Sequence, residues 1–61
     1  MAYNLGDNIT ITDLVEDKEF QGTVTVVDKT VNPEEYVVSI QPLGMSIKVD
    51  SQGKVIKYEN N

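Results

Sequence analysis

The sequence predicts an all-β protein, with five antiparallel strands in one small domain that covers residues 1–61. Val, Ile and Thr supply 19 of the 61 residues, whereas Ala and Leu supply 4. β-Branched side chains fit an extended backbone and crowd a helix, so this composition favours strands. Apolar and polar residues also alternate with a period of two, which is typical of strands with one buried face. Pro, Gly, Asn and Asp separate these segments, as expected of turns.

The five strands are expected at residues 6–12, 20–29, 36–41, 45–50 and 54–59. In each strand the apolar side chains at alternate positions are expected to share the face that points to the core. In chain order these are Ile9 and Ile11, then Phe20, Val24 and Val26, then Tyr36, Val38 and Ile40, then Met45, Ile47 and Val49, and finally Val55. The remaining apolar strand residues are expected on the outer faces, and these are Val27, Val37, Ile56 and Tyr58.

The connections between the strands favour antiparallel pairing. QPLG at residues 41–44 and DSQG at residues 50–53 both fit tight turns. In the second turn Asp50 is expected to cap the backbone and Gly53 to adopt the left-handed conformation. The longer connection at residues 12–19 is expected to contain a helical turn, and VNPEE after the second strand is expected to form a surface turn.

The segment LGDNITI, followed by a polar loop and FQGTV, resembles the opening of SH3-like folds of the KOW and Tudor types. The resemblance implies a single five-stranded antiparallel SH3-like small barrel, in which the second strand is long and curved. Gly22 would then permit the bend or a close approach of backbone. A five-stranded antiparallel meander is the alternative, because DSQG fits a hairpin where such barrels usually have a short 3₁₀ turn. The aromatic box and groove tryptophan of peptide-binding SH3 domains are missing, so proline-rich ligands are not expected.

The composition argues against an enzyme. The chain contains no His, Cys, Arg or Trp, which removes the common catalytic triads and thiolate metal sites. Its 4 glycines are scattered, so no phosphate-binding loop is predicted. The acids between residues 13 and 19 lack the spacing of a calcium loop. No cofactor and no metal site is therefore expected.

The formal net charge is −5, from 10 acids and 5 lysines. Phosphate contacts and anionic lipid both require clustered cations, so binding to nucleic acid or to a membrane is not expected. The first residues lack the basic and apolar regions of a signal peptide, and a cytoplasmic location is expected. The use of Asn, Lys, Ile and Val without Arg suggests an AT-rich bacterial or phage genome.

Two acidic loops are the predicted partner-binding site. In an SH3-like barrel the loops that follow the first and second strands lie side by side, which would gather 7 of the 10 acids into one acidic rim. Such a rim would attract a protein with a basic surface. Two neighbouring apolar residues would supply the anchor of the interface. The predicted rim comprises Asp13, Glu16, Asp17, Glu19, Asp28, Glu34 and Glu35, with Val31 and Tyr36 as the anchor.

The function predicted from these features is a small non-enzymatic interaction module, encoded by a phage or mobile element, that binds a host protein through the acidic rim and modulates or inhibits it. The alternative is a structural protein that forms a homo-oligomer, or docks in a larger particle, through Val27, Val37, Ile56 and Tyr58. A third alternative, nucleic-acid binding, would use three lysines of the last two strands, Lys48, Lys54 and Lys57.

Overall fold

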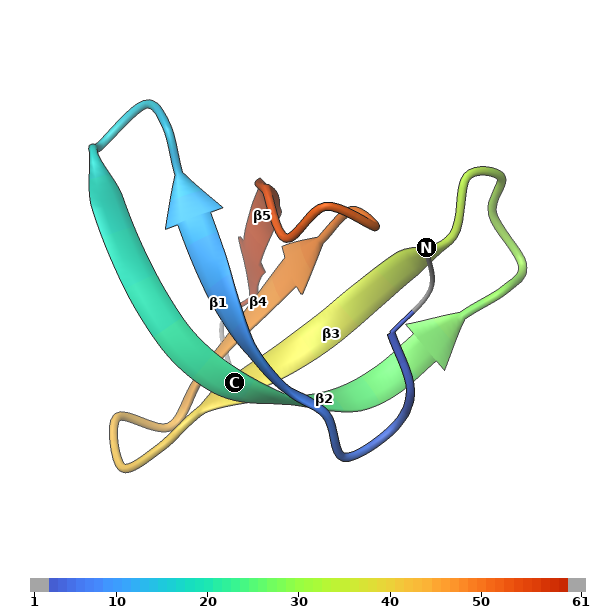
Figure 1. Ribbon diagram of the computed structural model, residues 1–61, viewed down its shortest axis with the longest axis horizontal. Helices are drawn as coiled ribbons and strands as arrows, with labels where there is room; N and C mark the ends of the chain where they lie inside the picture. The colour runs from blue at the N-terminus through green and yellow to red at the C-terminus, as the bar shows by residue number, and fades with distance from the viewer. Residues whose placement is uncertain (1–2, 60–61) are drawn as a thin grey trace.

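The computed structural model describes residues 3–59 as five antiparallel strands in one curled sheet, a half-barrel (Figure 1). The strands follow one another across the sheet in chain order, and no helix occurs in residues 3–59. The predicted fold class is confirmed, and the ends of the predicted domain, residues 1–2 and 60–61, lie outside the described part. The strands are β1 (Asn8–Asp13), β2 (Lys18–Asp28), β3 (Glu35–Ile40), β4 (Met45–Val49) and β5 (Val55–Glu59).

The long β2 strand shapes the half-barrel because it curves across the whole molecule (Figure 1). Residues 18–23 of β2 pair with β1, and residues 23–28 pair with β3. At Gly22 the neighbouring strand comes so close that an added Cβ would lie 2.5 Å from the carbonyl oxygen of Ser39. No side chain fits there, so the close approach predicted for Gly22 is confirmed.

A β-bulge between Val24 and Val26 reverses the alternation in the second half of β2. Beyond it, Val27 lies directly opposite the buried Tyr36 and packs against the core. Val26 instead pairs with Val37 and is 46% exposed. The prediction that Val26 faces the core and Val27 faces outwards is therefore wrong. The extra residue of the bulge shifts the alternation by one position, so Val27 faces the core and Val26 faces outwards.

A second irregularity lies between β4 and β5, at Lys48 and Val49. Val55 pairs with Val49 and packs against the core, as predicted. Tyr58, however, lies opposite the buried Ile47, so it is on the inner face of the sheet rather than the outer one. Ile56 lies at this irregularity, between Val55 and Lys57, which both pair with residues of β4. Its side chain is exposed.

The core fills the inner face of the half-barrel and draws on β1 to β4. These positions follow the predicted alternation, and burial of their side chains is the main stabilising contribution in a domain of this size. Partly buried rings and aliphatic chains of Tyr3, Phe20 and Met45 pack around them. The buried apolar residues are Ile11, Val24, Tyr36, Val38, Ile40, Ile47 and Val49.

The two ends of the sheet meet at a short seam. The amide N–H of Thr12 in β1 donates to the carbonyl oxygen of Gly53 at 2.9 Å, and Thr12 forms an isolated parallel bridge with Lys54. Gly53 is left-handed, with φ of 80°, and an added Cβ would lie 2.9 Å from the carbonyl oxygen of Thr10. Asp50 caps this turn by accepting the amide N–H groups of Gln52 and Lys54, as predicted.

Candidate functional site

The structure separates the two acidic loops that were expected to form one rim. The β1–β2 loop, residues 14–17, leads into the start of β2, whereas the β2–β3 loop, residues 29–34, follows its end. Figure 1 shows these loops on opposite sides of the molecule, because the curved β2 runs from one to the other. The single acidic rim is therefore not formed. Each loop has its own surroundings and is described separately.

The β1–β2 loop is held from beneath by Asp13, the last residue of β1. One carboxylate oxygen, Oδ1, accepts the backbone N–H groups of Val15 and Glu16, each at 3.0 Å. The other, Oδ2, accepts the hydroxyl hydrogen of Tyr58 in β5. The residue is only 6% exposed, so these bonds replace water at the charged group. Asp13 is thus a structural residue that fixes the loop, and it is not available to a partner as the rim prediction required.

The hydrogen bond between Asp13 and Tyr58 shifts both pKa values. The pKa of Asp13 lies below its ordinary 3.8, because the Tyr58 hydroxyl and the N–H groups of Glu16 and Val15 stabilise the carboxylate. The same bond raises the pKa of Tyr58 to about 12, since the phenolate would face a carboxylate. The Tyr58 ring also meets the edge of Phe20, with centroids 6.4 Å apart. The loop is therefore tied to the opposite end of the sheet.

The fixed loop presents an apolar tip. Leu14 is 68% exposed and Val15 is 92% exposed, and neither packs against the core. The chain turns back at Asp17, which has φ of 56°, and residues 14–17 form a tight hairpin turn. We call residues 14–17 the hairpin tip. The hairpin tip therefore presents two adjacent exposed aliphatic side chains on a loop that Asp13 holds in place.

Acidic side chains surround the hairpin tip. Glu16, Asp17 and Glu19 are exposed, and their carboxylates form no hydrogen bond or ion pair within residues 3–59. Lys18 is the one lysine among them along the chain. Sequence reasoning identified these acids but missed Leu14 and Val15, although two aliphatic residues in a short turn between strands are a visible signal.

The β2–β3 loop uses its acids internally. Asp28 accepts the Thr30 hydroxyl at 2.5 Å and the Thr30 N–H at 2.9 Å, and the hydroxyl bond is the main reason that its pKa is lowered. Glu35 is paired with Lys48 at 3.7 Å, and Glu34 accepts the Tyr36 hydroxyl at 2.9 Å. The predicted apolar anchor is also divided, because Tyr36 is 1% exposed and belongs to the core, while Val31 remains at the surface. Tyr36 as a contact residue is a correction to the prediction.

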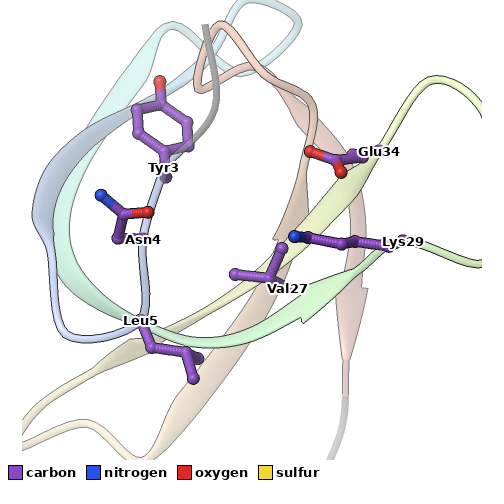
Figure 2. A pocket seen from close by; sticks show the side chains of 6 residues that line it. All are labelled: Tyr3, Asn4, Leu5, Val27, Lys29 and Glu34. Carbon is purple, nitrogen blue, oxygen red and sulfur yellow. The ribbon is translucent and has the colours of Figure 1, made fainter.

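An open pocket of about 470 Å³ lies beside the β2–β3 loop (Figure 2). Residues 3–5 form one side, and Val27, Lys29 and Glu34 form the other. Figure 2 shows the Lys29 amine and the Glu34 carboxylate pointing from this second side towards the first. Val27 reaches the pocket only because the bulge in β2 turns it inwards. The pocket was not predictable from the sequence, since it depends on that shift of register.

Within residues 3–59, no group of three or more Asp or Glu side chains is placed to hold a metal ion. Over the same range, no helix is long and apolar enough to span a membrane. Three surface features remain for function: the hairpin tip with its free carboxylates, the pocket beside Lys29 and Glu34, and the exposed Val26 beside Val37 on the outer face of the sheet. Comparison of the chain with family models, with curated proteins and with solved structures found no match.

Proposed function

We propose that this protein is a small non-enzymatic interaction module that binds another protein through its hairpin tip. The observation that carries the proposal is the exposure of Leu14 and Val15 on a loop fixed by Asp13. Interfaces usually depend on a few apolar anchors that enter a pocket of the partner. A loop that is already ordered loses little conformational entropy on binding, which favours affinity.

The acids beside the tip define the chemistry of the partner. Glu16, Asp17 and Glu19 are exposed and unpaired in the described part of the chain. They would accelerate association with a basic surface and add specificity. We therefore propose a partner with an apolar pocket bordered by Lys or Arg. Occupation of that pocket by Val15 would block it, so the proposed effect on the partner is inhibition.

The fold proposed for this module is an SH3-like small barrel. Five antiparallel strands, a long curved second strand with a close approach at Gly22, and contact between β1 and the turn before β5 support it. The connectivity alone equally fits a meander that curls until its ends touch.

The proposal is tested by affinity capture followed by measured binding. Wild type and the variant Val15→Ser are immobilised beside the matched control Val31→Ser, which alters an exposed valine of the other loop. A specific partner is expected to be retained by wild type and by the control. Binding of the purified partner by calorimetry is expected to weaken by about 2 kcal/mol for Val15→Ser, the loss typical of an interface anchor.

The charge component is tested on the same purified partner. The pair Glu16→Lys and Asp17→Lys is expected to slow association at low salt, and the difference from wild type is expected to shrink as salt is added. The control Glu59→Lys changes a carboxylate at the end of β5. A partner that binds all of these variants with the wild-type affinity would overturn the proposal.

Self-association through the outer face of the sheet is a second candidate. It is favoured by the exposure of Val26 beside Val37, two valines that face each other across β2 and β3. Lys48 and Lys57 continue the same row, which separates the valine pair from Ile56. The expected observation is a dimer in sedimentation equilibrium that Val26→Thr converts to monomer. A wild-type monomer at high micromolar concentration would exclude this candidate.

A further inference from the structure

The pocket beside the β2–β3 loop opens where the N-terminal segment leaves the sheet. The Gly6 N–H donates to the Val24 carbonyl oxygen, and the Val24 N–H donates to the Asp7 carbonyl oxygen, both at 2.9 Å. Beyond this pairing, residues 3–5 diverge from β2 and leave the space that Figure 2 shows. Its volume of about 470 Å³ lies in the range of sites for small ligands.

One buried side chain organises this pocket. The ring of Tyr36 meets Tyr3 edge to face, with centroids 5.1 Å apart, and its hydroxyl donates to Glu34 at 2.9 Å. Val27 lies directly opposite Tyr36 in the sheet. Three of the lining side chains are thus placed by a residue of the core. A pocket ordered in this way requires little rearrangement when a ligand enters.

Opposite charges stand on the same side of the pocket. Lys29 and Glu34 form no ion pair with each other, and Lys29 forms none within residues 3–59. In Figure 2 both charged groups point across the pocket towards Tyr3 and Asn4, and Val27 and Leu5 add apolar surface. The pocket therefore offers one positive group, one negative group and an apolar wall.

We propose that this pocket binds a free α-amino acid with an apolar side chain, such as leucine. The carboxylate of the ligand would contact Lys29, its ammonium group would contact Glu34, and its side chain would cover Val27 and Leu5. A ligand with one charge would engage only one of these two charged groups, so a zwitterion is favoured over it. A phosphorylated ligand would face the Glu34 carboxylate. This site is independent of the hairpin tip, which lies at the other end of β2.

The test is a titration of the ¹⁵N-labelled protein with L-leucine, followed by ¹H–¹⁵N correlation spectra. Saturable shifts are expected at the amides of Tyr3, Val27 and Lys29. Two analogues that each lack one charge, 4-methylpentanoate and isoamylamine, are expected to bind about tenfold more weakly, because each loses a charge-assisted contact. The amide of Val15 is expected to remain unshifted.

Variants separate the two charge contacts. Lys29→Met keeps an apolar stem without the ammonium, and Glu34→Gln can still accept the Tyr36 hydroxyl, so both are expected to fold. Each is expected to weaken leucine binding by about tenfold. The control Lys54→Met removes an exposed lysine at the seam and is expected to bind leucine as wild type does.

Two results would overturn the inference. The first is the absence of saturable shifts at the pocket up to the solubility limit of leucine. The second is equal binding of leucine and its singly charged analogues, which would show an unspecific apolar surface. Val15→Ser is expected to bind leucine normally, so failure of the hairpin-tip proposal and failure of this one give different results.

Discussion

The two acidic loops at the ends of β2 are similar in composition and opposite in construction. The β1–β2 loop is supported by Asp13 from below and leaves its other carboxylates unpaired at the surface. In and beside the β2–β3 loop, Asp28, Glu34 and Glu35 all engage neighbouring side chains. The number of acids in a loop therefore does not define a binding surface. What matters is which carboxylates the fold itself already uses.

The largest expected loss of stability comes from a substitution within β2, the strand that runs between the two loops. Gly22→Ala would place a Cβ 2.5 Å from a backbone oxygen of β3 and is expected to cost about 3 kcal/mol of unfolding free energy. Gly44→Ala is the matched control, because nothing lies within 4 Å and only its left-handed φ of 71° opposes alanine. It is expected to cost about 1 kcal/mol. Urea unfolding measures both, and equal losses would contradict the close approach.

A smaller loss of stability is expected when the carboxylate that supports each loop is removed. Asp13→Ala removes the acceptor of two backbone N–H groups and of the Tyr58 hydroxyl, whereas Asp28→Ala removes contacts to Thr30 alone. The melting temperature is expected to fall more for Asp13→Ala, because a buried acceptor is lost. Thermal unfolding by circular dichroism provides the measurement. An equal fall for both variants would mean that the hairpin tip is no better supported than the other loop.

The smallest effects are those of pH. Asp13 and Asp28 have lowered pKa values in the folded protein, so their contribution to stability is present above about pH 4 and is lost as pH falls through the folded values. Tyr58 has its pKa raised to about 12, so its contribution is present below about pH 10 and is lost as pH rises from there to about 12. Melting curves across both ranges measure these losses.

Tyr58→Phe separates the two pH ranges. It is expected to reduce the alkaline loss, with a part remaining because burial also raises the pKa of Tyr36. It is also expected to reduce the acidic loss, because Asp13 would lose its hydroxyl donor. The acidic loss that belongs to Asp28 is expected to persist, since that carboxylate depends on Thr30. An unchanged alkaline profile in this variant would contradict the pairing of Tyr58 with Asp13.

The strands could be predicted from the sequence because most segments carry one unambiguous alternation. The predictions failed where neighbouring positions are both apolar, as at Val26 and Val27, so that either phase buries a valine. The position of the bulge then decides which valine faces the core, and that position depends on how β2 bends over β3. At the candidate site the exposed acids of the first loop were predictable. The partner of Asp13 was not, since Tyr58 lies 45 residues away in the chain.

The seam at Thr12 and Gly53 has a consequence for the order of folding. Every other strand pairing joins neighbours in the chain, so each can form as a hairpin with a small loop-closure cost. Contact between β1 and the turn before β5 must wait for the four hairpins and is expected to form last. It is then also the first contact to open in the native state. Hydrogen exchange at the Thr12 amide would report this opening, and the hairpin tip would then keep the local bonds of Asp13 to Val15 and Glu16 but lose its tie to Tyr58.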